Sequence, residues 1–517
     1  MKRFGILFLI GTLVLLYLAP GVVAVSNVKI DSRVLQDTGS GQAADFLVVL
    51  RSQSDTRAES ARASDRIERG RLVYRALRQT ADASQPAVRS FLEALGVPYH
   101  AYWVVNLFAV HADRSVVDAL AARGDVLAIE SDRAFHVDLE QAWAGQTNVP
   151  NTVEWNVNQV NAPALWAMGY TGQGLVYANA DTGVRWDHPA LQPHYRGWNG
   201  ATADHNYNWW DAIHADLSGM GADTCETGGF VPLPASGSLQ PCDDYGHGTH
   251  TMGTGIGDDG AGNQIGVAPG AKWMACRNMD NGVGRPSTYI ECMQFFLAPT
   301  DLSGQNPDPG RRPDAVGNSY TCPPSEGCLA NSLLTAMDNM RAAGILMAVA
   351  AGNSGPGCSS ITDPPAIYDS AITAGATAGD DSIAGFSSRG PVTVDGSNRR
   401  KPDLAAPGVG VRSSFNGSGA SYIYMSGTSM AAPHVAGAAL LLWSAFPALR
   451  GQVGQTEYVF QQSALHKPAS QMCGGDVPGQ VPNNDYGYGR IDALAAFRFQ
   501  QNFTGLFKLF LPDIKRN

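Results

Sequence analysis

The stretch Gly174-Leu-Val-Tyr-Ala-Asn-Ala180, directly before Asp181-Thr-Gly-Val184, decides how most of this 517-residue chain is interpreted. It is an apolar run of strand length that follows a glycine, which is typical of a buried strand. Ile345-Leu-Met-Ala-Val-Ala350 has the same character, and helical patterns cover residues 331–343 and 430–446. Alternating strands and helices predict an α/β fold, with a parallel sheet covered by helices on both faces.

Three candidate catalytic residues lie where such strands end or where helices begin. Asp181 follows the first strand, His247 lies in Tyr245-Gly-His-Gly-Thr-His250, and Ser429 lies in Ser426-Gly-Thr-Ser-Met-Ala-Ala-Pro433. Parallel sheets carry their active sites beyond the carboxyl ends of the strands. A serine hydroxyl needs an adjacent base, an imidazole is a suitable one at neutral pH, and a carboxylate orients the imidazole. These three residues therefore predict a nucleophilic serine site.

The same region offers donors for the oxyanion of acyl transfer. Asn353 follows a strand, so its side-chain amide can point into the site. Ser429 is expected to begin a helix, which leaves its backbone N–H outside the helical hydrogen bonding. Pro433 fits this placement in the first helical turn, where proline is tolerated. Gly437 and the neighbouring alanines are expected to let this helix pack tightly against the sheet.

These segments resemble the signatures of the subtilisin-like serine peptidases, the subtilase family. The motifs that match, in the family's order, are Asp181-Thr-Gly-Val184, His247-Gly-Thr-His250, Ala351-Gly-Asn353 and Gly427-Thr-Ser-Met-Ala-Ala-Pro-His434. The resemblance covers about residues 155–497 and implies a subtilisin-like peptidase domain. It implies an endopeptidase that hydrolyses protein and peptide substrates through an acyl-enzyme, with no cofactor required for catalysis.

The resemblance also implies a role for each matching residue. Asp181 would orient the imidazole, and His247 would act as general base and acid. Ser429 would be the nucleophile, and Asn353 the oxyanion-hole donor. Three substrate-binding residues are implied as well: Ser319 on the strand that pairs with the substrate backbone, and Ala351 and Gly352 in a wall of the specificity pocket.

Residues 44–137 form a separate α+β pattern. Their strands and helices follow the order β-α-β-β-α-β, which predicts a ferredoxin-like sandwich. This unit resembles the inhibitory propeptide of the family, which implies self-processing in the linker at 138–154. Residues 1–24 combine a basic start, a short apolar run and small residues, as a secretory signal does. We therefore expect a secreted protein that has no membrane anchor after signal removal. Residues 498–517 are expected to form a C-terminal tail, whose role the sequence does not indicate.

The charge distribution argues against nucleic acid as a partner. Residues 25–137 are neutral, whereas the chain from 138 onward has 20 basic and 32 acidic residues. Acidic loops could hold structural calcium at an unknown site. Asp243-Asp244 is one candidate, although a solvated loop is the favoured interpretation. The arginines of 51–78 are interpreted as a solvated helix face because acidic residues balance them.

Eight cysteines in an exported chain predict disulfides rather than a metal site, because no spacing matches a zinc module. Cys225 with Cys242 is the favoured pair. Cys322 and Cys328 bracket a turn, and each could instead reach a more distant cysteine such as Cys358.

The residues distinguish the peptidase from two other functions. A binding or scaffolding protein on the same fold would lack a triad residue, and none is missing. An α/β-hydrolase esterase would need a G-x-S-x-G motif and the order Ser, acid, His, which this chain does not have. The insertion at about Asp211–Cys242 departs from the family pattern and leaves specificity open. We expect a monomer.

Overall fold

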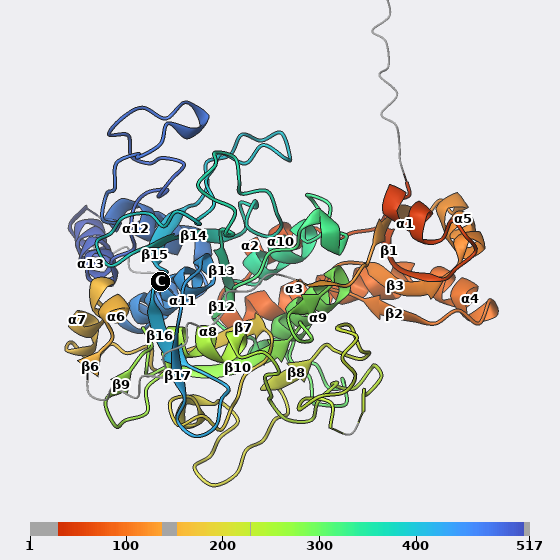
Figure 1. The fold of residues 1–517 in the computed structure, drawn as a ribbon, viewed down its shortest axis with the longest axis horizontal. Helices are drawn as coiled ribbons and strands as arrows, with labels where there is room; N and C mark the ends of the chain where they lie inside the picture. The colour runs from red at the N-terminus through yellow and green to blue at the C-terminus, as the bar shows by residue number, and fades with distance from the viewer. Residues whose placement is uncertain (1–28, 137–151, 228, 511–517) are drawn as a thin grey trace, which may run out of the picture.

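The computed structural model describes residues 29–136, 152–227 and 229–510. The expected signal segment and most of the expected linker lie outside them. A small N-terminal unit, residues 29–136, precedes a larger unit that begins at Thr152 (Figure 1). Among the described helices, none combines the length and the apolar character needed to cross a bilayer.

The larger unit is built on a seven-stranded parallel sheet with the order β15-β14-β13-β12-β7-β10-β8. This confirms the predicted α/β fold class. The chain passes from β7 to the strands on one side of it, and then returns to build the other side from β12 onward. The strands are β7 (Val176–Asp181), β8 (Trp209–Asp211), β10 (Lys272–Arg277), β12 (Ala315–Asn318), β13 (Leu346–Ala350), β14 (Ile372–Thr377) and β15 (Leu404–Pro407).

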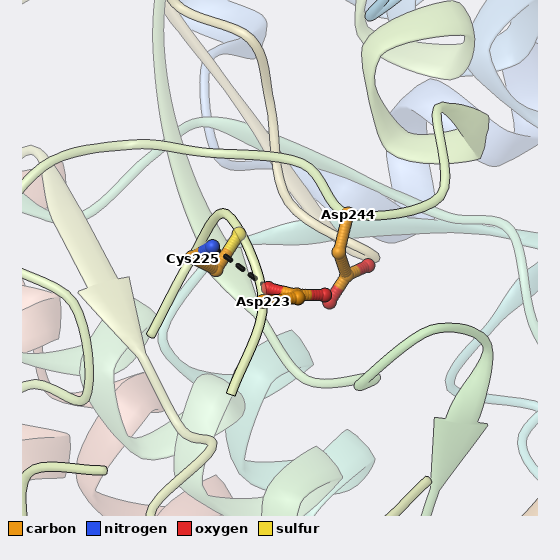
Figure 2. Close-up of side chains that lie close together, drawn as sticks. All are labelled: Asp223, Cys225 and Asp244. Atoms are coloured by element: carbon orange, nitrogen blue, oxygen red, sulfur yellow. Dashed lines mark hydrogen bonds between the residues drawn. The ribbon is translucent and has the colours of Figure 1, made fainter. Parts of the chain in front are cut away.

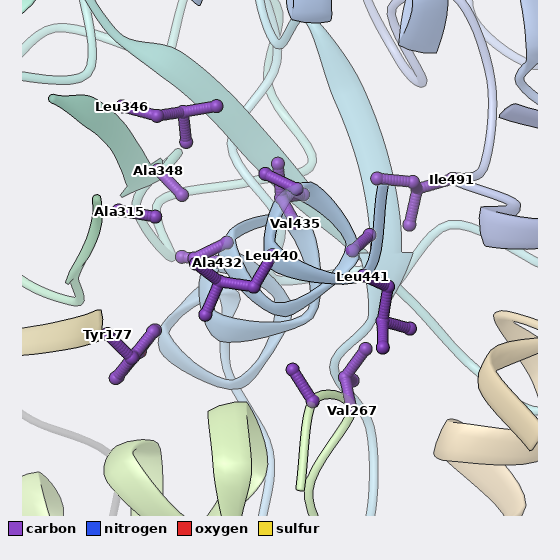
Figure 3. Packing of buried hydrophobic residues seen from close by; sticks show 14 of the residues in the cluster. Tyr177, Val267, Ala315, Leu346, Ala348, Ala432, Val435, Leu440, Leu441 and Ile491 are labelled. Atoms are coloured by element: carbon purple, nitrogen blue, oxygen red, sulfur yellow. The ribbon is translucent and has the colours of Figure 1, made fainter. Parts of the chain in front are cut away.

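Helices cover both faces of this sheet. On one face lie α8 (His247–Ile256) and α11 (Thr428–Ala445), and on the other lie α9 (Pro286–Leu297) and α10 (Leu334–Ala342). Every side chain from Thr428 to Trp443 is buried, so α11 forms the centre of one core. Figure 3 shows this core around the labelled side chains Tyr177, Val267, Ala315, Leu346, Ala348, Ala432, Val435, Leu440, Leu441 and Ile491.

Gly437 packs against α8 and a following loop, and not against the sheet as predicted. A Cβ at this position would lie 2.7 Å from Val267 Cβ and 3.1 Å from the carbonyl oxygen of Gly255. The glycine therefore lets α11 approach the end of α8 closely, which brings together the two helices that carry Ser429 and His247.

The small unit has a four-stranded antiparallel sheet with the order β2-β3-β1-β4. Its core lies between this sheet and two helices, where Phe46, Phe108, Leu92 and Leu120 are buried together. The elements are α1 (Ser32–Asp37), β1 (Ala44–Leu50), α2 (Thr56–Ala61), α3 (Arg66–Ser84), α4 (Pro86–Ala94), β2 (Tyr99–Tyr102), β3 (Leu107–Ala112), α5 (Arg114–Ala122) and β4 (Val126–Ser131).

The small unit docks on α9 and α10 of the larger unit. Val73 and Leu77 of α3, with Val104 from the β2–β3 turn, share one buried cluster with these helices. Arg66 pairs with the buried Asp314 at 2.8 Å, and Arg69 of α3 donates to the Gly451 carbonyl at 2.6 Å. The prediction of a solvated helix face is therefore wrong for this side of α3, because balanced charge along a sequence does not reveal which side docks.

All eight cysteines are paired in the structure. The favoured bridge, Cys225–Cys242, is confirmed. Cys322 bonds Cys328 rather than a distant partner, so that alternative is wrong. The other two bridges are Cys276–Cys292 and Cys358–Cys473.

Candidate active site

The candidate residues gather at the carboxyl edge of the parallel sheet. Asp181 is the last residue of β7, Ser319 directly follows β12, and Ala351-Gly-Asn353 directly follows β13. These three strands are neighbours in the sheet, and the chain reverses its order beside β7. This is the position at which open α/β sheets bind ligands. His247 is the first residue of α8, and Ser429 is the second residue of α11.

Asp181 and His247 form a fully buried hydrogen-bonded pair. His247 Nδ1 lies 2.6 Å from Asp181 Oδ1, and both side chains are 0% exposed. Because the carboxylate accepts from Nδ1–H, the neutral ring carries its lone pair on Nε2. The backbone N–H of Thr182 also donates to Oδ1, at 2.8 Å, and the Thr251 hydroxyl donates to Oδ2 at 3.1 Å. The carboxylate is thus held in one orientation toward the imidazole.

The turn that leads into α8 is fixed by the buried carboxylate of Asp243. It accepts from the backbone N–H groups of Gly246 at 2.7 Å and Thr249 at 2.8 Å, and from the Thr182 hydroxyl at 2.9 Å. The pKa of Asp243 is raised, because the effect of its burial is larger than that of the hydrogen bonds from Thr249 and Gly246, which lower it. The prediction of a solvated loop at Asp243-Asp244 is wrong, because both carboxylates are buried.

Ser429 and Ser319 bond to each other in both directions. The Ser429 hydroxyl donates to the Ser319 carbonyl at 3.0 Å, and the Ser319 hydroxyl donates to the Ser429 carbonyl at 2.9 Å. The second bond replaces one that the helix lacks, because Pro433 has no N–H for the carbonyl four residues earlier. Pro433 lies inside α11 and not in its first turn as predicted, since the helix begins at Thr428.

The side chain of Asn353 is oriented by the start of α11. Its Oδ1 accepts from the backbone N–H and from the hydroxyl of Thr428, both at 3.0 Å. The Thr428 hydroxyl in turn accepts from the backbone N–H of Gly352 at 3.1 Å. With Oδ1 committed to these donors, the NH₂ group of Asn353 points away from Thr428. The arrangement provides an oriented amide donor beside Ser429.

Sequence reasoning missed the threonines that hold these groups. Thr251 follows His247 by four residues, so the helical repeat places both on one face of α8, and this spacing could have identified it. Thr182 and Thr428 each adjoin a candidate residue, but their contacts depend on segments far away in sequence. Nothing in the local pattern indicates them.

Comparison with known proteins agrees with this geometry. The model of the Subtilase family matches residues 172–489. The chain belongs to the subtilase family. Bacillopeptidase F of Bacillus subtilis (strain 168) is 35% identical over 449 residues, which cover 82% of this chain and 28% of that protein. Subtilisin E of the same strain is 29% identical over 345 residues, covering 66% of this chain and 72% of that protein. An alkaline protease of Shouchella clausii is 29% identical over 348 residues, covering 66% and 70%.

Two sets of side chains in this subtilase, among the residues that the structure describes, are close enough to share a metal ion. One is Asp223, Cys225 and Asp244, and the other is Asp223, Glu226 and Asp280. Figure 2 shows the first set, with the carboxylates of Asp223 and Asp244 facing each other. The sulfur of Cys225 is bonded to Cys242, so it is no thiolate ligand. Neither set includes a residue of the predicted triad.

Proposed function

We propose that this subtilase is a serine endopeptidase with Asp181, His247 and Ser429 as its catalytic triad. Ser429 Oγ would attack the scissile carbonyl while His247 accepts its proton, and His247 would then protonate the leaving amine before water hydrolyses the acyl-enzyme. The observation that carries the proposal is the fully buried hydrogen bond between Asp181 and His247. His247 begins α8, and this helix packs against α11, which carries Ser429. Relatives named as a bacillopeptidase and an alkaline protease support it.

The proposed oxyanion donors are the side-chain amide of Asn353 and the backbone N–H of Ser429. The bonds from Thr428 to Asn353 Oδ1 support this, because they turn the amide nitrogen away from the helix. Such preorganised donors stabilise the charge that develops in the transition state. We assign substrate contacts to Ser319, and to Ala351 and Gly352, because all three lie at the same sheet edge.

We propose that the small unit inhibits the site until it is cleaved off. Its last described segment, β5 (Phe135–His136), pairs antiparallel with β11 (Val283–Gly284), which precedes α9. Addition of a strand to an exposed edge is how peptides bind without strong sequence selection. β5 thus has the pairing expected of a substrate chain, and it runs directly into the region where we expect cleavage, residues 138–154.

We also propose that the enzyme is secreted. Four disulfides fit an oxidising compartment outside the cytoplasm. All four lie in the larger unit, and one of them, Cys276–Cys292, joins β10 to α9 in its core. Protein substrates and the small unit are the partners that this function requires.

Two experiments test the proposal. A fluorophosphonate probe should label the mature wild-type protein at Ser429. The His247→Ala variant, with its small unit removed by an added metalloprotease, should label far more slowly because the hydroxyl loses its base. The Ser429→Ala variant should accumulate as the full precursor. A mature protein without label at Ser429 would refute the enzyme, whereas normal processing of Ser429→Ala would refute self-cleavage alone.

A further inference from the structure

A cleft of 630 Å³ lies where α2 and α3 of the small unit meet α10 and the start of α12 (Val453–Ser463) of the larger unit. Guanidinium groups from both units line it: Arg57 and Arg69 from the small unit, and Arg341 from the larger unit. None of its lining residues belongs to the proposed active site. The cleft is therefore a separate feature of the boundary between the two units.

Two carboxylates also line the cleft, but each is already paired. Asp338 lies 2.8 Å from a guanidinium nitrogen of Arg57, and Asp369 lies 2.6 Å from one of Arg399. Because these two acids have partners of their own, they leave the other cations of the cleft largely uncompensated.

Arg69 is the cation of the cleft that lacks an acid. Within the described part of the chain it forms no ion pair. Its Nη1 donates to the Gly451 carbonyl at 2.6 Å, and its Nε is buried without a hydrogen-bond partner. A guanidinium in this position retains donor capacity for a further acceptor.

The region behind Arg69 has an excess of positive charge. Arg66 of the small unit and Arg450 of the larger unit both pair with the buried Asp314, at 2.8 and 2.7 Å. Arg312 is 1% exposed, and its hydrogen bonds among the described residues go to carbonyl groups. Its burial and the nearby charge of Arg66 lower the pKa of Arg312 to about 9. Four guanidinium groups, counting Arg69, thus share one carboxylate, and a nearby anion would offset the excess.

The start of α12 adds backbone donors to the cleft. No side chain of the described residues caps this 11-residue helix, and its first N–H groups lie at the positive end of the helix dipole. Arg341 lies beside the first turn, because a Cβ at Gly454 would be 3.5 Å from its Nη2. Arg69 contacts Gly451, two residues before the helix. Two guanidinium groups therefore lie near the same helix start.

The hydroxyl of Ser370 is independent evidence for a ligand. Ser370 lines the cleft and is 4% exposed, and its Oγ has no hydrogen-bond partner among the described residues. The carbonyl of the preceding residue, Asp369, accepts from Arg341 Nη1 at 3.3 Å, so Ser370 lies next to the guanidinium that adjoins α12. A buried hydroxyl that lacks a partner is expected where an ion or water completes the site.

We propose that this cleft binds a small inorganic oxyanion, such as sulfate, between Arg69 and the start of α12. Guanidinium groups and helix N-termini both favour oxyanions, and the Ser370 hydroxyl adds a neutral donor. Water would fill the rest of the cleft. Because the walls come from both units, the bound ion would join them and stabilise the docked small unit.

The test is titration calorimetry with sodium sulfate on the full precursor, which carries Ser429→Ala to prevent self-digestion. Arg69→Gln and Ser370→Ala each remove one donor. Arg75→Gln is the matched control, because Arg75 is an exposed arginine of the same helix that does not line the cleft. Sodium chloride keeps the ionic strength constant, and the Tm of each protein is measured with and without sulfate.

We expect saturable binding to the parent, and binding at least about tenfold weaker to Arg69→Gln, because a charged donor is lost. Ser370→Ala should weaken binding less, and Arg75→Gln should match the parent. Sulfate should raise the Tm of the parent more than that of Arg69→Gln, whereas a general salt effect would be equal in both. Circular dichroism without sulfate verifies folding, and Ser370→Ala decides the matter if Arg69→Gln does not fold.

A parent without saturable sulfate binding would overturn the site. Equal sulfate affinity in the parent and in the folded donor variants would do the same. Because the readout is binding of an ion outside the proposed active site, either result would leave the proposed peptidase activity untouched.

Discussion

Two aspartate–histidine pairs in this molecule have nearly the same local geometry and very different surroundings. In the larger unit, His247 Nδ1 lies 2.6 Å from Asp181 Oδ1, with both side chains 0% exposed. In the small unit, His111 Nδ1 lies 2.8 Å from Asp45 Oδ1, with side chains 53% and 45% exposed. The bond length therefore does not distinguish a candidate catalytic pair from a surface contact.

The surroundings distinguish the two pairs. Asp181 ends a central parallel strand and accepts further hydrogen bonds from Thr182 and Thr251. Asp45 lies on β1 directly opposite His111 on β3, where water competes for both groups. An exposed pair of this kind contributes about 0–1 kcal/mol. Burial and a fixed orientation are what the proposed catalytic role of Asp181 and His247 requires, and the exposed pair has neither.

Asp181→Asn should produce the largest difference between the two pairs. An amide in place of the carboxylate favours the wrong imidazole tautomer, so we expect acylation to slow by about 10⁴-fold. The measurement is the rate of fluorophosphonate labelling at Ser429 after an added metalloprotease, which the probe does not label, has removed the small unit. Asp187→Asn is the control, because the exposed Asp187 stays in the mature protein and pairs with Arg185, and it should label at the wild-type rate. A rate within tenfold of wild type for Asp181→Asn would mean that this buried pair is structural.

Asn353→Ala tests whether the oriented amide acts on the transition state. Loss of one oxyanion donor slows such reactions by about 10²–10³-fold. We expect kcat on a peptide substrate to fall by this factor while KM changes little, because the amide would contact the oxyanion rather than the bound substrate. A fall caused only by misfolding would also change the Tm, which serves as the check. An unchanged kcat would remove Asn353 from the proposed site.

The parallel sheet, and the strand end and helix starts that carry Asp181, His247 and Ser429, were predictable because short motifs determine them. Asp181 ends an apolar run of strand length, and Ser429 begins a long run of small and apolar residues, so strand ends and helix starts could be located locally. The element order of the small unit followed from periodicity for the same reason. Local patterns determine which segment a residue belongs to, and topology then brings these segments to one edge.

Features that depend on distant packing were not predictable. Asp243 and Asp244 look like loop residues in the sequence, yet the chain folds over both of them. Arg66 is similar to its exposed neighbours until α3 docks on Asp314. Pro433 was placed one turn too early, because the missing N–H is compensated by Ser319, which lies 110 residues away in sequence. Each case needed a partner that sequence spacing does not reveal.

His434 is a buried histidine whose ring contacts an amide and a carbonyl instead of a carboxylate, and it should make the stability of the protein depend on pH. Burial lowers the pKa of His434 to about 4, and its ring contacts Asn156 at 2.9 Å and the Met430 carbonyl at 2.8 Å. The unfolded state, with a pKa near 6.5, binds the proton more readily, so stability is present above pH 6.5 and is lost as pH falls toward 4. We expect this group to reduce the free energy of unfolding by about 2 kcal/mol between pH 7 and pH 5.

The check is the Tm of the Ser429→Ala protein at both pH values, with and without His434→Gln. The glutamine can retain a hydrogen bond to Asn156 but cannot be protonated, so the variant should lose less stability on acidification. If both proteins lose the same amount, other groups cause the acid sensitivity.

The smallest effect should come from a double-mutant cycle on Asp45 and His111. Asp45→Asn, His111→Gln and the double variant should give a coupling free energy below about 1 kcal/mol, and it should weaken further in salt because both groups face water. Thermal unfolding of the full precursor measures it. Asp45 also pairs with Arg285 of the larger unit at 3.3 Å, so the single variant could loosen docking by itself, and the cycle separates that contribution from the histidine contact. A coupling of several kcal/mol would show that this exposed pair interacts as strongly as a buried one. Burial would then no longer explain why the pair in the larger unit, and not the pair in the small unit, is the candidate for catalysis.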